Sequence, residues 1–173
     1  MHEKKPYTLW LLGPTSSGKT TIANAFIQAL SAKCIKILHY DGDEVRGFFG
    51  NEYGFTEDNR RNIVSTLAHL SSKANKAGIN VIVSALTAHQ SARDYIRQSI
   101  PNLLIGYISC PIDICAKRDP KGLYKKAQTG EIDTLIGYNS EYIVPDNPDI
   151  IIDTNSLDLE KCVQSLIDFL DSR

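Results

Sequence analysis

The chain has 173 residues, 42% of them hydrophobic and 23% charged, which is typical of one globular domain with a sizeable core. Its formal net charge of -1 argues against a general basic surface for nucleic acid, and no apolar run is long enough to span a membrane. The cysteines, Cys34, Cys110, Cys115 and Cys162, form no C-x-x-C pair, so we expect free, mostly buried thiols and no zinc site. With a polar N-terminus unlike a signal peptide, this predicts a cytoplasmic protein without nucleic-acid or membrane partners.

The first predicted unit is a strand, a glycine loop and a helix. An apolar strand is expected over residues 7–12 and an amphipathic helix over 20–30, and residues 13–20 between them match G-x-x-x-x-G-K-T. Glycines let several N–H groups converge on a phosphate, and the helix N-terminus adds the positive end of its dipole. Lys19 would reach the β- and γ-phosphates, and the hydroxyl of Thr20 would bind Mg²⁺. A chance glycine-rich turn is the alternative, which the flanking strand and helix disfavour.

A second strand, over 35–40, ends in two acidic residues, Asp41 and Asp43. Acidic side chains at the carboxyl end of a strand lie where open α/β sheets bind ligands. This favours phosphoryl transfer, with Asp41 nearer the metal and Asp43 accepting the proton of an attacking hydroxyl. The alternative is that Asp41 caps the next turn and Asp43 lies in solvent. A loop rich in glycine and aromatic residues is expected over 47–55.

The remaining elements alternate in the same way, which predicts an α/β fold with a mostly parallel five-stranded sheet and helices on both faces. We therefore expect one three-layer P-loop NTPase-type kinase domain over residues 1–173, with no second domain. The other expected elements are a helix from Thr56 to about Ala77 with an apolar face of Ile63, Leu67, Leu70 and Ala74, strands over 79–84, 103–108 and 150–152, and helices over 89–98, 111–118 and 157–170.

Basic residues gather in segment 118–126, around Pro120 and Gly122. A solvated helix face is the usual role of such a run. Because Pro120 and Gly122 should interrupt a helix, and Leu123 and Tyr124 lie among the charges, we favour a mobile basic lid over about 118–140. Such a lid would place arginine and lysine on the phosphates of ATP.

Several segments together match one family pattern over nearly the whole length of the chain. They are the glycine loop, residues 41–46, Gly54-Phe55-Thr56 with Arg60, Ala77-Gly78, residues 118–127, Gly130-Glu131, Pro145 and Asp153-Thr154. In these segments the chain resembles the adenylylsulfate kinase family. The resemblance implies an ATP-dependent kinase acting on the ribose 3′-hydroxyl of adenosine 5′-phosphosulfate, a homodimer, and acceptor contacts from Arg46, Phe55, Arg60 and Lys121.

The acceptor side departs from the family pattern at three places. Leu86-Thr87-Ala88-His89 stands where the family has Phe-Ile-Ser-Pro, in a segment after the third strand that is one residue shorter here. Ile63 replaces an asparagine, and Leu135 replaces the second aromatic ring that sandwiches adenine. We therefore favour a sister kinase for another 5′-activated nucleotide, such as cytidine diphosphoramidate in capsule biosynthesis. A true adenylylsulfate kinase of sulfate assimilation is the alternative. A catalytically inactive nucleotide-binding regulator is a third reading, which the retained motifs disfavour.

The sequence therefore predicts one site that binds ATP, the acceptor and Mg²⁺. The ATP-binding residues are Gly13, Pro14, Thr15, Ser16, Ser17, Gly18, Lys19, Thr20, Thr21, Arg118 and Lys125. The acceptor-binding residues are Arg46, Phe55, Arg60, Thr87, His89, Lys121, Gly122, Leu123 and Leu135. The catalytic residues are Lys19, Asp41 and Asp43, and Mg²⁺ is bound by Thr20 and Asp41.

Overall fold

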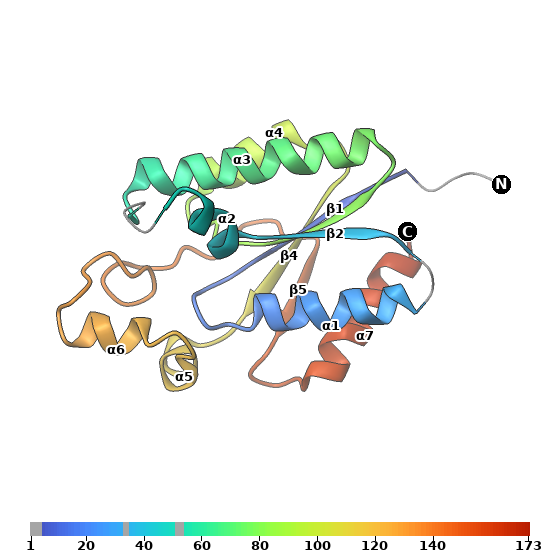
Figure 1. Cartoon of the computed structure of the whole chain (residues 1–173). Helices are drawn as coiled ribbons and strands as arrows, with labels where there is room; N and C mark the ends of the chain where they lie inside the picture. Colours follow the sequence, from blue (N-terminus) through green and yellow to red (C-terminus); the bar gives the residue numbers. More distant parts are fainter. Residues whose placement is uncertain (1–4, 33–34, 51–53) are drawn as a thin grey trace.

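The short apolar runs of the chain form a five-stranded, all-parallel sheet in the order β2-β3-β1-β4-β5 (Figure 1). The structure is a computed structural model that describes residues 5–32, 35–50 and 54–173. Its strands are β1 (Thr8–Leu12), β2 (Ile37–Asp41), β3 (Asn80–Ser84), β4 (Leu103–Ser109) and β5 (Ile150–Asp153). Its helices are α1 (Lys19–Ser31), α2 (Gly42–Phe48), α3 (Glu57–Lys76), α4 (Gln90–Ser99), α5 (Ile112–Arg118), α6 (Leu123–Gln128) and α7 (Leu159–Asp171). The predicted α/β fold with a parallel sheet is confirmed.

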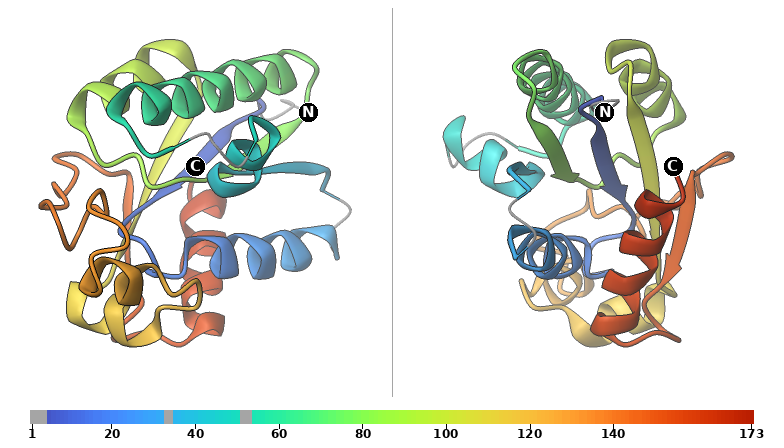
Figure 2. Two further views of the ribbon diagram at one scale, coloured as in Figure 1. Left: turned by 60° about the vertical axis from the view of Figure 1, so that its left-hand side comes forward. Right: turned by 90° about the vertical axis from the view of Figure 1, so that its right-hand side faces the viewer.

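The sheet is covered on both faces because its central strand is apolar on both. Successive side chains of a strand point to opposite faces, so Trp10 and Leu12 pack with α3 and α4, whereas Leu9 and Leu11 pack with α1 and α7. All four side chains are fully buried. Figure 2 shows the resulting three layers, with α3 and α4 on one side of the sheet and α1 and α7 on the other.

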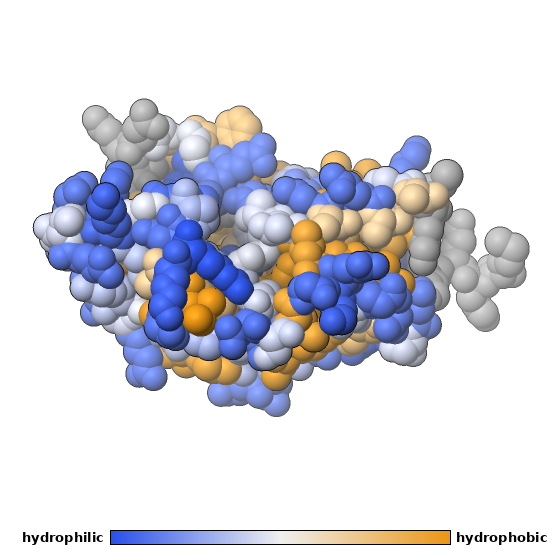
Figure 3. Space-filling view, turned by 90° about the horizontal axis from the view of Figure 1, so that it is seen from below, coloured by the Kyte–Doolittle hydropathy of each residue, from blue (hydrophilic) through white to orange (hydrophobic). Residues whose placement is uncertain are grey.

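Seen from below, apolar side chains also reach the surface over α1 and α7 and over α5 and α6, among hydrophilic ones (Figure 3). Leu159, at the start of α7, is 43% exposed. Among the described helices, none has both the length and the apolar character that a membrane span requires.

The long helix α3 follows the signals that predicted it. The hydroxyl of Thr56 accepts a hydrogen bond from the backbone N–H of Asn59 at 3.2 Å, which caps the first turn. Gly78 follows the helix at a φ of +82°, a conformation that glycine adopts without strain. One member of the predicted apolar face, Leu70, is 37% exposed rather than part of the core.

Two segments predicted to be irregular are partly helical, and residues 51–53 of the loop predicted over 47–55 lie outside the described residues. Residues 47 and 48 are the last residues of α2. This helix starts at Gly42, because the Asp41 carboxylate accepts the N–H of Asp43 and caps its first turn. The lid contains α6, which begins directly after Gly122. The interruption expected at Pro120 and Gly122 is present, since residues 119–122 are not helical, and α6 starts directly after it. Gly122 has a φ of +66°, and the Asp119 carboxylate accepts the N–H groups of the first turn of α6.

The cysteines Cys110, Cys115 and Cys162 are free and buried, as expected, and Cys34 lies outside the described residues.

Candidate active site

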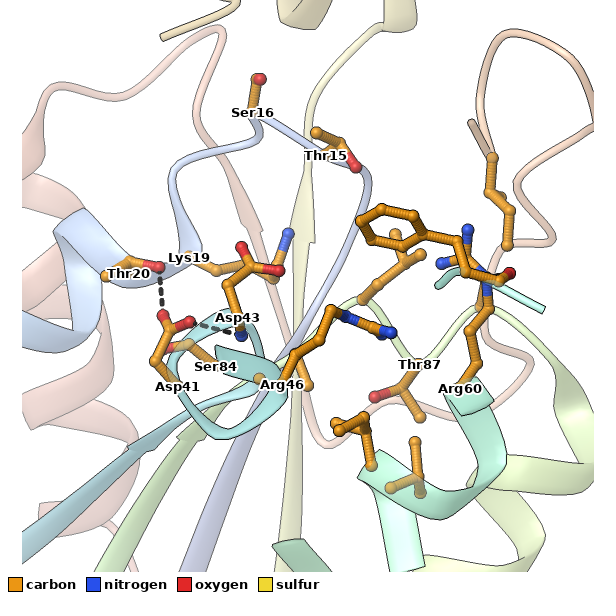
Figure 4. A pocket seen from close by; sticks show the side chains of 18 of the residues that line it. Thr15, Ser16, Lys19, Thr20, Asp41, Asp43, Arg46, Arg60, Ser84 and Thr87 are labelled. Carbon is orange, nitrogen blue, oxygen red and sulfur yellow. Dashed lines mark hydrogen bonds between the residues drawn. The ribbon is translucent and has the colours of Figure 1, made fainter. Parts of the chain in front are cut away.

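The carboxyl ends of the strands meet at one edge of the sheet, where a cavity of about 990 Å³ opens. Its walls come from the glycine loop, α2, α3, the segment after β3, the lid and the segment after β5. Figure 4 shows two groups of side chains in it: Lys19, Thr20, Asp41 and Asp43 on one side, and Arg46, Arg60 and Thr87 on the other. A single cavity therefore joins the phosphate loop to the residues expected to bind the acceptor.

The phosphate loop, residues 13–20, has a backbone that few other sequences could adopt. A Cβ on Gly13 would lie 2.3 Å from the carbonyl oxygen of Ile108, so only glycine fits. Lys19 Nζ donates to the carbonyl oxygens of Gly13 at 2.9 Å and Pro14 at 2.7 Å. Burial lowers the pKa of Lys19 to about 8, although the nearby Asp43 and Asp41 raise it. The ammonium group thus lies inside the loop, beside carboxylates.

Asp41 connects the phosphate loop to α2. One of its carboxylate oxygens accepts the hydroxyl of Thr20 at 2.6 Å, and the other accepts the N–H of Asp43 at 2.8 Å (Figure 4). Asp41 therefore caps a helix, as one sequence reading had it, and also lies against the predicted metal-binding hydroxyl. Asp43 is not left alone in solvent, because its carboxylate forms an ion pair with Lys121 Nζ from the lid.

A ring and two guanidinium groups form the opposite side of the cavity. The guanidinium carbon of Arg46 lies 4.6 Å from the centre of the Phe55 ring, and that of Arg60 lies 5.3 Å from it. Arg60 also donates to the carbonyl oxygens of Phe55 at 2.9 Å and Thr134 at 2.8 Å. Burial and the nearby Arg46 lower the pKa of Arg60, so a bound anion would relieve the repulsion between the two cations.

Thr87 lies in the segment after β3, which forms one wall of the cavity, and its hydroxyl and carbonyl groups both accept hydrogen bonds from other residues. Its hydroxyl accepts the indole N–H of Trp10 at 2.9 Å, and its carbonyl accepts Arg93 Nε at 3.0 Å. Thr87 has a φ of +40°, which is unusual for a residue with a branched side chain. His89 lines the cavity beside it, whereas Gln90 does not and pairs with Asp94 on its own helix.

The lid contributes some of its predicted residues to the cavity. Lys121, Leu123 and Leu135 line it, but the exposed Lys125 does not. Leu135 is 6% exposed and packs with Tyr124 in the core of the lid. Tyr138, which would be the obvious replacement for a missing second ring, is 48% exposed and does not line the cavity.

The far end of the cavity includes residues that the sequence did not single out. Arg118 donates to the hydroxyl of Thr154 at 3.1 Å and to its carbonyl at 2.6 Å, and the Thr154 hydroxyl bonds to the carbonyl of Ser17 at 2.9 Å. Leu157, Leu159 and Cys162 provide an apolar wall there. Thr154 was noted only as part of a family motif, and the apolar wall lies on what the sequence presents as an ordinary helix start.

Two buried supports were also missed. Trp10 is fully buried and Arg93 is 1% exposed, and both hold Thr87. A polar group on a buried side chain needs a partner, so the single tryptophan in an apolar strand was a usable signal. Arg93 offered none, because it looks like any charged residue of a polar helix.

Comparisons with known proteins agree with this geometry. A family model described as adenylylsulphate kinase matches residues 5–153. The adenylyl-sulfate kinase of Bacillus velezensis is 34% identical over 171 residues, covering 98% of this chain and 87% of that protein. A probable adenylyl-sulfate kinase of Archaeoglobus fulgidus is 36% identical over 152 residues, covering 88% of this chain and 98% of that protein. The structure of the Mycobacterium tuberculosis APS kinase with AMPPNP and APS superposes with a TM-score of 0.91 at 29% identity, covering 98% of this chain and 99% of that one.

Proposed function

The chain belongs to the adenylylsulfate kinase family, and from this we infer that it transfers the γ-phosphate of ATP to the ribose 3′-hydroxyl of adenosine 5′-phosphosulfate. It is a phosphotransferase with an alcohol group as acceptor, in a P-loop kinase fold. The observation that carries the proposal is that one cavity holds both groups of residues. In it, Asp43 lies between the phosphate loop and the two arginines, Arg46 and Arg60, that lie against the Phe55 ring. Two substrates bound end to end would bring a hydroxyl to this carboxylate.

The contacts of the residues assign each of them a role in binding ATP, binding the acceptor or accepting the proton. Lys19 and the loop N–H groups would bind the β- and γ-phosphates of ATP, and Arg118 would lie over the nucleotide at the far end of the cavity. Arg46 and Arg60 would hold the 5′-anionic group of the acceptor, with its base against Phe55. Asp43 would accept the proton of the 3′-hydroxyl, since the oxygens of Asp41 already serve Thr20 and α2.

The donor set beside the loop fits Mg²⁺. Thr20 and Asp41 present a hydroxyl and a carboxylate oxygen 2.6 Å apart, and Mg²⁺ prefers hard oxygen ligands completed by phosphates and water. Within the described ranges, no three His, Cys, Asp or Glu residues gather into a site that would hold a metal without substrate. Bound with ATP, the ion would neutralise developing charge on the phosphates.

Lys121 has two possible partners in this scheme. Its ion pair with Asp43 holds the lid across the cavity, and an acceptor anion would compete for the same ammonium group. We propose that acceptor binding draws Lys121 away from Asp43, which frees the carboxylate for the 3′-hydroxyl.

We also propose a homodimer, which light scattering on the purified protein would test.

The base of the acceptor nucleotide distinguishes the two candidate functions. The sequence favoured a cytidine derivative, whereas the relatives support the alternative, adenosine 5′-phosphosulfate. One observation still favours a second candidate: Leu135 packs into the lid core where the family places a ring. A base–ring stack contributes about 1–3 kcal/mol, so adenosine 5′-phosphosulfate should bind about 5- to 100-fold more weakly than in a kinase with both rings.

Steady-state kinetics decide between the candidates. Purified enzyme with MgATP is given adenosine 5′-phosphosulfate or cytidine diphosphoramidate, and 3′-phosphorylated product is measured. We expect a higher kcat/KM for the adenosine substrate. A higher kcat/KM for the cytidine substrate would reverse the assignment, and ATP consumption that no acceptor increases would support the inactive regulator instead. The Leu135→Phe variant should lower KM for the adenosine substrate if the missing ring matters, with Ile143→Phe, at an exposed position that does not line the cavity, as the control.

A further inference from the structure

A tyrosine of the lid reaches the phosphate loop from behind. Tyr124 lies in the first turn of α6 and is 1% exposed, within the lid core of Cys110, Cys115, Ala127 and Leu135. Its hydroxyl donates to the carbonyl oxygen of Thr15 at 3.1 Å. Thr15 and the following Ser16 line the cavity at the tip of the loop. A single side chain thus connects the core of the lid to the backbone that is expected to bind phosphate.

The contact fixes the orientation of one peptide group. In a trans peptide the carbonyl and the following N–H point in opposite directions. When Tyr124 holds the Thr15 carbonyl toward the lid core, the N–H of Ser16 is directed away from that core. Ser16 has a φ of +65°, which a residue other than glycine rarely adopts without support. The hydrogen bond from Tyr124 is such a support, because a rotated peptide would lose it.

The tyrosine itself is held firmly. The Asp119 carboxylate accepts the N–H of Tyr124 at 3.1 Å and that of Lys125 at 3.0 Å, which fixes the start of α6. A Cβ on Gly137 would lie 3.5 Å from the Tyr124 hydroxyl, so the turn at Gly137 packs closely over it. Burial raises the pKa of Tyr124 well above its usual value, and the phenol therefore stays protonated and able to donate.

We propose that Tyr124 is a positioning residue: its hydroxyl holds the Thr15–Ser16 peptide in the orientation that binds phosphate. The proposal rests on the proposed function in that ATP is taken as the ligand of the loop.

The test compares the Tyr124→Phe variant with Tyr142→Phe. Each change removes one buried hydroxyl and keeps the ring, but the Tyr142 hydroxyl bonds to the Leu86 carbonyl at 3.5 Å, away from the phosphate loop. Binding of a non-hydrolysable ATP analogue with Mg²⁺ is measured by calorimetry. We expect a Kd about 2- to 10-fold higher in Tyr124→Phe, the range for one buried hydrogen bond, and an unchanged Kd in Tyr142→Phe.

Two further measurements separate positioning from a general loss of stability. In Tyr124→Phe the KM for ATP should rise while the KM for the acceptor stays within about twofold, and amide hydrogen exchange over residues 13–18 should become faster without nucleotide. An unchanged Kd for the analogue, an equal rise in both KM values, or a variant that does not fold would overturn the proposal. If the unmodified enzyme does not bind the analogue, the proposed function fails instead, so the two failures are distinct.

Discussion

Burial of Lys19 makes the charge of the phosphate loop depend on pH. Its pKa is lowered to about 8 in the free enzyme, so the ammonium group is present below pH 8 and is lost above it. We expect kcat/KM for ATP to fall about tenfold per pH unit above pH 8, because this parameter follows the ionisation of the free enzyme. At saturating ATP, kcat should fall only at higher pH, because bound phosphates favour the charged lysine.

A pH profile between 6.5 and about 10 would check this prediction. The acceptor concentration is kept saturating, so that ionisation on the acceptor side does not enter kcat/KM for ATP. A profile of kcat/KM that stays flat to pH 9.5 would contradict it and would place the pKa of Lys19 near its usual value.

The two aspartates at the end of β2 should respond differently to the loss of charge. Asp43→Asn should reduce kcat by about 100-fold or more, the usual scale for loss of a general base, with little change in KM for ATP. Asp41→Asn keeps a good helix cap but weakens the contact with Thr20, so its larger effect should fall on Mg²⁺ and ATP binding. Normal turnover in Asp43→Asn together with an inactive Asp41→Asn would reverse the two roles.

For single residues, the sequence predicted the motifs made of neighbouring residues. It did not predict the contacts between residues that lie far apart in the chain. The loop motif and the acidic turn are contiguous, and their chemistry follows from residue type and spacing. Tyr124 meets Thr15 across 109 positions, and Thr154 meets Ser17 across 137. Nothing in the spacing of one sequence reports such contacts, because they depend on how the sheet brings its carboxyl ends together.

Among the elements, the lid has a defined helix but few regular contacts beyond it. Its later part belongs to an irregular stretch over residues 129–149 that contains no helix or strand, only an isolated bridge between Ile136 and Ser140. Its links to the rest of the site include those of Tyr124 to the loop, Lys121 to Asp43 and Arg118 to Thr154, and the hydrogen bond from Arg60 to the Thr134 carbonyl. Such a segment is expected to become ordered when substrate fills the space beneath it.

Limited proteolysis tests this view of the lid. Trypsin should cut after Lys121, Lys125 or Lys126 more slowly when an ATP analogue and Mg²⁺ are bound. Cleavage after the exposed Lys36, before β2, serves as the control and should be unchanged. Equal cleavage of the lid with and without nucleotide would show that it does not close over ATP.

The two helices that the sequence missed share a cause. Glycine and proline near a helix start lower its predicted tendency to form, yet a side chain outside the helix can compensate. Asp41, at the end of β2, caps α2, and Asp119 caps α6 behind Gly122. The long helix α3 was predicted well because its cap, its apolar period and its terminal glycine all lie within its own sequence.

At the scale of the whole molecule, the nucleotide site draws on segments that lie far apart in the chain. The phosphate loop, the end of β2, Arg118 and the segment after β5 all line one cavity, and they meet only in the folded state. A ligand that binds the folded but not the unfolded chain stabilises it by mass action, about 2.7 kcal/mol at 100 times its Kd. For a chain of this size we expect the melting temperature to rise by about 5–10 °C with an ATP analogue and Mg²⁺.

The Lys19→Ala variant is the matched control for this thermal shift. Among the described residues, its side chain hydrogen-bonds to the carbonyls of Gly13 and Pro14 within the loop. The variant without ligand should therefore unfold near the temperature of the unmodified enzyme. With the analogue it should show little or no rise, and it should have no measurable turnover, because the charge that binds the β- and γ-phosphates is gone. An equal rise in both proteins would mean that the analogue binds elsewhere. A variant that melts much lower without ligand would mean that Lys19 supports the fold as well as the phosphates.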